Sequence, residues 1–224
     1  MEMQLNTPGS NGTINEESPT DELVAWTLKR FANQRIIMTT SFGMEGCALI
    51  DMYAAHGHPF TVVYLDTMFF FEETYQLRDR LIKRYPHVTF ENRGTTLTPE
   101  EQANRHGEKL WETDSDLCCK IRKVDPMRKA VADADVWITG LRRSQSRARA
   151  WKFQLLKISP LAKWERAQVW EYIKEHDVPY NELHERGYPT IGCTHCTRVV
   201  PGLAIDEYSR AGRWSGTSKT ECGL

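Results

Sequence analysis

Short apolar runs alternate with longer stretches of helical periodicity along most of the chain. RIIMTT at 35–40, FTVVYLDT at 60–67 and VWITGLRR at 136–143 are rich in β-branched residues and lead into polar turns, which is typical of buried strands. KFQLLKI at 152–158 indicates a fourth strand, and HVTFEN at 87–92 is a weaker candidate. Strands that are apolar on both faces occur in parallel sheets covered by helices. The pattern therefore predicts an α/β fold with a doubly wound, mostly parallel sheet.

Helical spacing predicts the elements that connect these strands. Thr20 has the chemistry of a helix N-cap and precedes a first helix of about three turns. MEGCALIDMYAAHG at 44–57 predicts a helix that Gly57 closes, and EETYQLRDRLIKRY at 72–85 predicts another. An apolar face around Val169 marks a later helix.

Turns that follow the strands are the first places to look for ligand-binding residues. In doubly wound sheets ligands bind beyond the carboxyl ends of the strands, which selects the turns at 41–43, 66–68 and 140–146. The turn of Ser41, Phe42 and Gly43 could present backbone N–H groups to a phosphate, although Ser and Gly also serve ordinary turns. Asp66 and Thr67 could meet a ribose or a base, or could simply cap the next helix.

Basic residues gather at the same predicted edge. Four arginines follow the third strand: Arg142, Arg143, Arg147 and Arg149. Guanidinium groups match phosphate and sulfate oxygens bidentately, so a converging set suggests a substrate rich in such oxygens. For any single arginine, a solvated surface loop is the alternative. Arg210 and Arg213 would join this set only if the C-terminal segment folds over the site.

Composition and charge indicate how many domains the chain forms and argue against some classes of partner. The 224 residues are 40% hydrophobic and 26% charged with a formal net charge of -1, which favours one α/β domain at 20–216 and indicates no nucleic-acid or membrane partner. The polar start predicts a disordered arm at 1–19, and the Gly/Ser-rich end a mobile tail at 217–224. With neither a signal peptide nor a spanning segment in view, we expect a cytoplasmic protein.

Six cysteines in a chain without a secretion signal point to ligation or catalysis rather than to disulfides. The adjacent Cys118 and Cys119 can join the CxxC pair Cys193 and Cys196 as four ligands. Adjacent cysteines fit awkwardly around one tetrahedral zinc ion, which favours an iron–sulfur cluster. A zinc site and a redox pair at Cys193 and Cys196 stay open. His195 is a neighbour of this set, or a further ligand.

The two remaining cysteines differ in their surroundings. Cys47 lies among apolar residues of a predicted helix, as a small buried side chain would. Cys222 lies alone in SGTSKTECGL, and a mobile tail suits a nucleophile that swings in and out of a site. An inert terminal thiol is the alternative.

Seven motifs, in one order over residues 20–224, resemble the assimilatory adenylyl-sulfate (APS) reductases, relatives of the phosphoadenylyl-sulfate (PAPS) reductases. They are SFGMEG, LDTMFFFEETY, CCKIRKVDPMRKA, WITGLRRSQS, YNELHERGYPTIGCTHCTR, RAGRW and KTECGL. The resemblance implies an adenine-nucleotide alpha-hydrolase-like fold with a flexible catalytic tail. Met68 replaces the glycine usual in the LDTG turn, which questions the positive-φ geometry there. Glu165 replaces the Ser or Thr that usually caps a helix.

The resemblance also implies roles for individual residues. Cys118, Cys119, Cys193 and Cys196 match the ligands of one [4Fe–4S] cluster per subunit. Cys222 matches the nucleophile, and Lys123, beside Arg122, matches a link between cluster and substrate. The implied substrate-binding residues are Ser41, Phe42, Gly43, Leu65, Asp66, Thr67, Arg122, Gly140, Arg142, Arg143, Arg147, Arg210 and Arg213.

The implied reaction converts adenylyl sulfate to sulfite and AMP in sulfate assimilation. It proceeds through an S-sulfo-cysteine on Cys222 that thioredoxin or a similar dithiol donor resolves. The four-cysteine set favours APS, with PAPS or dual use as the alternative, and a homo-oligomer is compatible with it. A reading from another class is an iron–sulfur or zinc sensor that only binds a nucleotide. A third reading, ATP-dependent adenylation, lacks the usual SGGxDS loop at residues 41–46.

Overall fold

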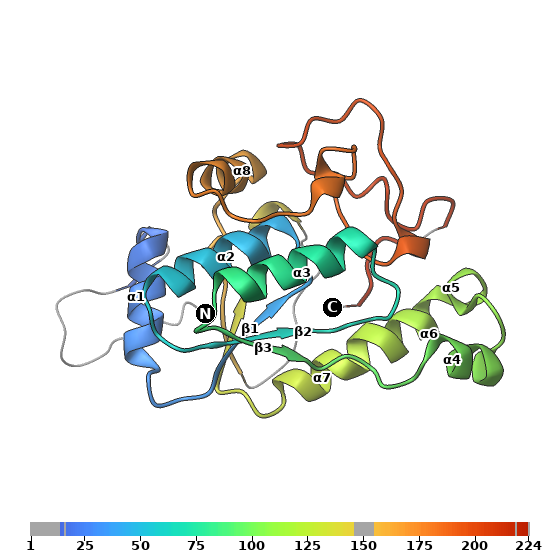
Figure 1. Cartoon of the computed structure of the whole chain (residues 1–224), viewed down its shortest axis with the longest axis horizontal. Helices are drawn as coiled ribbons and strands as arrows, with labels where there is room; N and C mark the ends of the chain where they lie inside the picture. Colours follow the sequence, from blue (N-terminus) through green and yellow to red (C-terminus); the bar gives the residue numbers. More distant parts are fainter. Residues whose placement is uncertain (1–13, 16, 146–154, 218, 224) are drawn as a thin grey trace.

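The computed structural model describes residues 14–15, 17–145, 155–217 and 219–223 (Figure 1). Its centre is a five-stranded sheet, parallel throughout, in the order β3-β2-β1-β4-β5. The strands are β1 Ile36–Thr40, β2 Thr61–Tyr64, β3 Thr89–Asn92, β4 Val136–Thr139 and β5 Leu156–Ile158. The chain winds outward from β1 in one direction and from β4 in the other. This confirms the predicted doubly wound α/β fold and places a topological switch point between β1 and β4.

Helices cover both faces of the sheet (Figure 1). They are α1 Thr20–Arg30, α2 Met44–Ala55, α3 Glu72–Arg84, α4 Pro99–His106, α5 Leu110–Thr113, α6 Ser115–Cys119, α7 Asp125–Val131 and α8 Arg166–Glu175. A π-helical turn, Lys120–Val124, joins α6 to α7. Three 3₁₀ turns complete the set at Arg143–Gln145, Glu182–His184 and Thr194–Cys196.

Neighbouring residues of each central strand are buried in opposite layers. Met38 and Ile138 pack with α2, α3 and α8, whereas Ile37 and Trp137 pack with α7. The register aligns Ile37 with Trp137 and Met38 with Ile138, so each layer receives side chains at the same height. This two-sided burial explains why the strands read as continuous apolar runs.

Some local predictions about helix ends need correction. Thr20 is not an N-cap: Pro19 precedes α1, and Thr20 is the first helical residue. Its hydroxyl instead accepts a hydrogen bond from Trp164 Nε1 at 2.8 Å. The oxygen that would cap the helix is therefore used in a tertiary contact. At the start of α8, the backbone N–H of Glu165 donates to Gln168 Oε1 at 2.8 Å, which closes this helix end without Ser or Thr.

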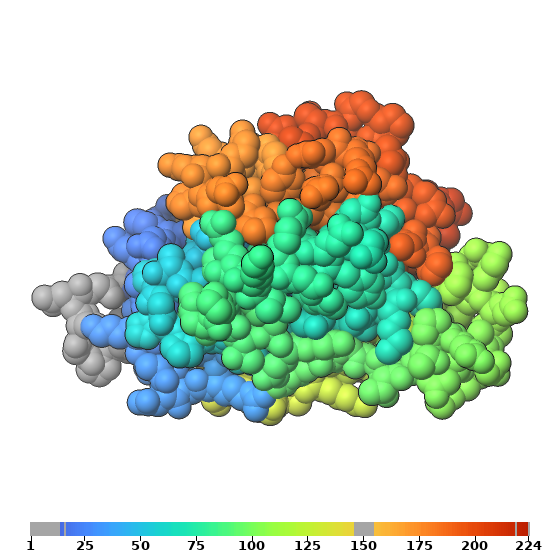
Figure 2. Space-filling model, in the orientation of Figure 1, coloured from blue at the N-terminus to red at the C-terminus, as the bar shows by residue number. Residues whose placement is uncertain are grey.

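Several other features bear on the sequence predictions. The N-terminal arm and the tail stay predictions, because residues 1–13, 16, 218 and 224 lie outside the described part. Arg147 and Arg149 also lie outside it. None of the helices in the described part is long and apolar enough to cross a membrane. The segment after β5 runs along one side of the molecule and meets the α4–α6 region at one end (Figure 2).

Two adjacent positions of α3 allow a matched test of this core. Leu81 is fully buried between the helix and the sheet, whereas the side chain of Ile82 points outward and the residue is 41% exposed. We expect Leu81→Ala to lower the free energy of unfolding by about 2–5 kcal/mol through lost contacts and a cavity. Ile82→Ala should change it by about 0.5 kcal/mol or less. Urea unfolding measures both, and equal losses would contradict this packing.

Candidate functional site

A pocket opens at the carboxyl ends of β1, β2 and β4, at the switch point of the sheet. One wall comes from turns that follow these strands: Ser41, Gly43, Leu65, Thr67 and Gly140. The opposite wall comes from residues far along the chain: Ile191, Gly192, Tyr208, Arg210, Arg213 and Cys222. Lys123 also reaches this pocket. The fold therefore brings strand turns and the C-terminal segment together, although Ser41 and Cys222 are 181 positions apart in the chain.

The turns after β1 and β2 share an unusual backbone conformation. Phe42 has φ 59° and is buried in the core, while Met68 has φ 58°. The N–H of Met68 donates to Asp66 Oδ1 at 2.7 Å, which closes the turn. Met68 thus adopts the positive φ expected of glycine, so the turn keeps this geometry although methionine replaces the usual glycine. Asp66 also accepts from Tyr75 at 2.9 Å and is not the cap of α3, which Phe71 precedes.

Of the arginines predicted to bind substrate after β4, the two in the described part of the chain, Arg142 and Arg143, are not among the residues that line the pocket. Arg142 is buried, and its Nε lies 2.9 Å from a carboxylate oxygen of Glu45 in the first turn of α2. A Cβ at Gly140 would come within 3.0 Å of the Glu45 Cβ, so this close approach requires glycine. Arg143 is exposed and lines a separate groove near β5.

Two buried polar residues of the pocket wall were not predicted from the sequence. Arg166 lies at the start of α8 and His184 lies in a 3₁₀ turn, and each buries one nitrogen that has no partner among the described residues. Burial, together with the charge of Arg166, lowers the pKa of His184 to about 4, so this imidazole is neutral. His184 lies within the motif YNELHERGYPTIGCTHCTR, but the sequence assigned no role to it or to Arg166, because their importance depends on a wall assembled from distant segments.

A second, smaller cavity contains the four candidate ligands. Cys118, Cys119, Cys193 and Cys196 are all buried and all line it. Asp114 caps α6 by accepting from the N–H of Leu117 at 2.9 Å, and so orients the first pair. The N–H of Thr194 donates to the carbonyl of Phe69 at 2.8 Å, which ties the second pair to the turn after β2.

Aromatic side chains enclose this cysteine cavity. His195 stacks on Trp111 with ring centroids 3.7 Å apart and 6° between the planes, and Phe69 meets both rings edge-on. All three line or pack against the cavity. Within the described part of the chain, no three Cys, His, Asp or Glu side chains converge closely enough to hold a single metal ion. The ring contacts of His195 in this cavity are those with Trp111 and Phe69.

A π-helical turn carries the basic residues from the cysteines toward the pocket. Arg122, within Lys120–Val124, is fully buried and donates to Gln102 at 2.7 Å and to the carbonyl of Thr67 at 2.8 Å. Lys123, the next residue, lines both the cysteine cavity and the larger pocket. The wider π turn changes the angular spacing of the helix, and such turns recur at functional sites.

Lys123 and the neighbouring cysteine thiols shift one another's pKa values toward the charged forms. Burial alone would lower the pKa of Lys123, but its electrostatic interactions with the Cys193 and Cys222 sulfurs outweigh burial and raise that pKa. For Cys193, burial would raise the pKa, but Lys123, Thr67 and Arg213 together lower it. Burial raises the pKa of Cys118 to about 11.

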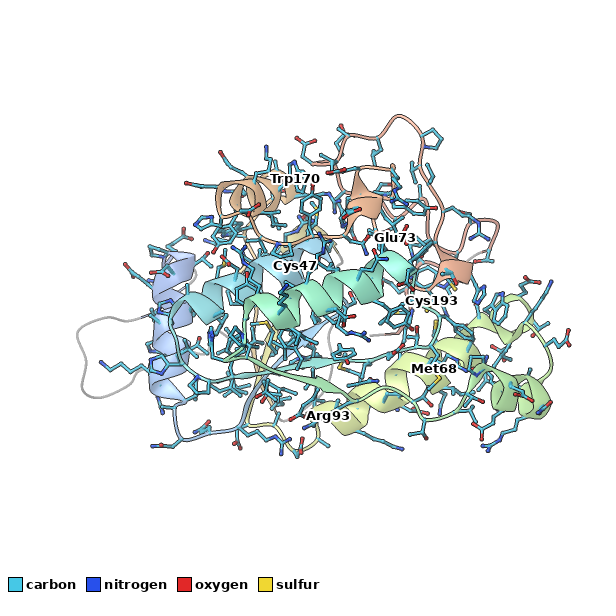
Figure 3. The ribbon with its side chains drawn as sticks, in the orientation of Figure 1. Cys47, Met68, Glu73, Arg93, Trp170 and Cys193 are labelled. Carbon is cyan, nitrogen blue, oxygen red and sulfur yellow. The ribbon has the colours of Figure 1, made fainter. Side chains whose placement is uncertain are left out.

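Cys47 and Cys222 have opposite environments. Cys47 is fully buried in α2, and burial raises its pKa to about 12, in keeping with the predicted packing role. Figure 3 shows Cys47 within the body of the molecule and Cys193 toward the end that also holds Met68. Cys222 is half-buried, lines the pocket with Lys123 and Arg213, and packs against the buried cysteines. The structure thus brings the predicted nucleophile beside the predicted cation.

Known proteins share this architecture. The phosphoadenosine phosphosulfate reductase domain matches residues 35–199. A protein named adenosine 5'-phosphosulfate reductase from Halalkalibacterium halodurans is 42% identical over 230 residues, covering 99% of this chain and 97% of its own. One of the same name from Lysinibacillus sphaericus is 41% identical and covers 91% and 89%.

Solved structures agree at the level of fold and family. A phosphoadenylyl-sulfate reductase from Candida auris, crystallised with phosphate, superposes with a TM-score of 0.71 at 32% identity, covering 82% of this chain and 91% of its own. An FMN adenylyltransferase from Candida glabrata reaches a TM-score of 0.55 at 15% identity over 90% of this chain and 72% of its own, which shows a shared fold. Together with the domain match, these relatives establish that the chain belongs to the phosphoadenosine phosphosulfate reductase family.

Proposed function

We propose that this enzyme reduces adenylyl sulfate to sulfite and AMP, using Cys222 as the nucleophile. The observation that carries the proposal is one pocket at the switch point of the sheet that combines a thiol, Cys222, with the cations Lys123, Arg210 and Arg213. Relatives that cover nearly the whole chain bear the name of this reaction. The turns at Ser41–Gly43 and Leu65–Thr67 would receive the nucleotide.

The first step forms a covalent intermediate. The Cys222 thiolate attacks the sulfur of the sulfonyl group, the sulfur–oxygen bond to the phosphate breaks, and AMP leaves with the bonding electron pair. Cys222 then carries an S-sulfo group. Negative charge grows on the leaving phosphate, and Lys123 and Arg213, which line the same pocket, would stabilise it.

The second step needs an external dithiol, for which thioredoxin or a similar carrier is suited. One of its thiolates attacks Cys222 Sγ and expels sulfite, leaving a mixed disulfide. The second thiol of the carrier attacks that disulfide and releases the Cys222 thiolate. The carrier is oxidised to a disulfide, and its two electrons reduce the transferred sulfur to sulfite.

The cysteine cavity fits a [4Fe–4S] cluster held by Cys118, Cys119, Cys193 and Cys196. Besides four buried sulfur ligands, its wall has a buried donor without a partner in the described chain, Arg122 Nη2. A sulfide or thiolate atom would accept from this donor. When bound, the cluster and its thiolates would supply negative charge behind Lys123. One cluster per subunit follows from one set of ligands.

Purified holoprotein tests this function directly. Incubated anaerobically with adenylyl sulfate and a thioredoxin system, it should release sulfite and AMP in equal amounts. A parallel assay with PAPS in place of adenylyl sulfate measures the substrate preference. A separate measurement, gel filtration with light scattering, gives the oligomeric state. Pyrophosphate release from ATP with no sulfite would support adenylation instead, and nucleotide binding without turnover would support a sensor.

Lys123 is the residue whose charge should matter most to this first step. Lys123→Met keeps much of the apolar stem but removes the cation beside Cys222, so we expect kcat to fall roughly 10²–10³-fold. Lys129→Met, an exposed lysine of α7, is the matched control and should keep normal kcat. Single-turnover formation of S-sulfo-Cys222 measures the effect, and equal rates in the two variants would contradict the assigned role.

A further inference from the structure

Lys219 lies three residues before Cys222 and is buried although it is a lysine. Its side chain is only 8% exposed, and its Nζ donates to the carbonyl of Ser115 at 3.1 Å. The same nitrogen pairs with the carboxylate of Asp116, whose side chain is 90% exposed. Both partners belong to the first turn of α6, the helix that carries Cys118 and Cys119.

A second contact holds this segment from another element. Arg210 Nε donates to the carbonyl of Thr220 at 3.2 Å, and its Nη2 lies 3.3 Å from a carboxylate oxygen of Glu221. Beyond Cys222, a Cβ at Gly223 would lie 3.3 Å from Val124 Cγ2, so the backbone runs close to the π turn. Residues 219–223 are therefore in contact with α6, with Arg210 and with the π turn.

Burial gives the Lys219 contact more weight than an ordinary surface pair. Exposed ion pairs contribute little because water solvates both separated charges. The face of Trp214, with its ring centroid 5.8 Å from Lys219 Nζ, shields the ammonium group from water. Without Ser115 and Asp116, the ammonium would lose its hydration and gain no hydrogen-bond partner in return, which costs free energy. Docking of the tail at this point thus depends on the first turn of α6.

We propose that Lys219 is a positioning residue that docks the tail on α6 and so places Cys222 in the pocket, an inference that rests on Cys222 being the nucleophile. The Lys219–Asp116 contact lies two residues from Cys118, so it joins the tail to the cysteine-bearing helix. Arg210, which lines the pocket, holds the other side of the same segment. The position of the thiol therefore depends on both the helix and the pocket wall.

The test compares Lys219→Met, Asp116→Asn, Lys219→Arg and the exchanged double variant D116K/K219D in holoprotein. Two quantities are measured anaerobically: the alkylation rate of Cys222 by iodoacetamide without substrate, and the single-turnover rate of S-sulfo-Cys222 formation. We expect Lys219→Met to raise the alkylation rate and lower the single-turnover rate, each by roughly 10-fold, which corresponds to about 1.4 kcal/mol of docking free energy. Lys219→Arg should restore both rates, and D116K/K219D should recover part of the loss.

A matched control comes from another lysine–aspartate pair of the same region. Lys120 pairs with Asp125 at 2.6 Å, but the Lys120 side chain is exposed, and the pair lies apart from the contacts that hold the described residues of the tail. Lys120→Met should leave both rates unchanged. Unchanged alkylation and single-turnover rates in Lys219→Met would overturn the proposal. Faster alkylation in a protein whose wild type never forms S-sulfo-Cys222 would instead uphold docking and reject the proposed function.

Discussion

Replacing Cys222 by serine is expected to lower sulfite release from adenylyl sulfate by roughly 10⁴-fold or more, because a hydroxyl cannot replace the thiolate as nucleophile. Affinity for AMP should persist, since Ser41–Gly43 and the basic pocket wall remain. Intact-protein mass spectrometry after incubation with substrate alone should show the mass of one added SO₃ group in the wild type. The variant should show none.

Cys47 provides the control for this change, because it is the cysteine that lies apart from both cavities. Cys47→Ala should retain the S-sulfo adduct and most of the activity, with only a packing cost to stability. Full activity of Cys222→Ser, or an adduct on another cysteine, would reject the role assigned to Cys222.

The second large effect is expected at the cysteines proposed to hold an iron–sulfur cluster. Cys193→Ser should remove iron and acid-labile sulfide from anaerobically purified protein, abolish the visible absorption, and reduce sulfite release to background. The physical reason is that serine removes one of the four thiolates proposed to hold the cluster, at a position whose sulfur lies 3.4 Å from Thr67 Oγ1 and beside Lys123. Losing the ligated cluster would also remove the link between α6 and the Thr194–Cys196 turn, so the melting temperature should fall.

Metal analysis of the wild type decides between the readings that the sequence left open. Iron and sulfide in equal amounts, at about four of each per chain, would support the cluster. A colourless protein that contains one zinc per chain would overturn it in favour of a zinc site. Cys47→Ala should keep the metal content of the wild type, which separates ligand loss from the general loss of a cysteine.

The pattern of apolar runs predicted the sheet well but missed the helices between β3 and β4. Buried strands can be recognised in the sequence because both faces of each strand must be apolar in a parallel sheet that helices cover on both sides. By contrast, α4 buries only Gln102, and α6 is a short helix whose buried residues are Cys118 and Cys119. These helices are stabilised by caps and by the cysteine cavity rather than by an apolar stripe, so periodicity gives little sign of them.

The candidate site divides in the same way. Residues in recognisable motifs, such as Cys193, Lys123 and Cys222, were predicted from the sequence and are brought together by the fold. Arg166 and His184 were missed because a single buried Arg or His has no local signature. Arg143, by contrast, belongs to a motif but lies exposed in another groove.

The parallel α/β fold, the two cysteine pairs and the thiol near the C-terminus could all be predicted before the structure was known. These follow from local facts: side-chain apolarity, cysteine spacing and neighbouring turn residues. Two arrangements could be seen only in the folded chain: Lys123 reaches both cavities, and Lys219, three residues before Cys222, contacts the first turn of α6. The glycine-like turn at Met68 could likewise be seen only there. The physical reason is that burial, charge pairing and wall formation depend on segments far apart in the chain, which no local pattern records.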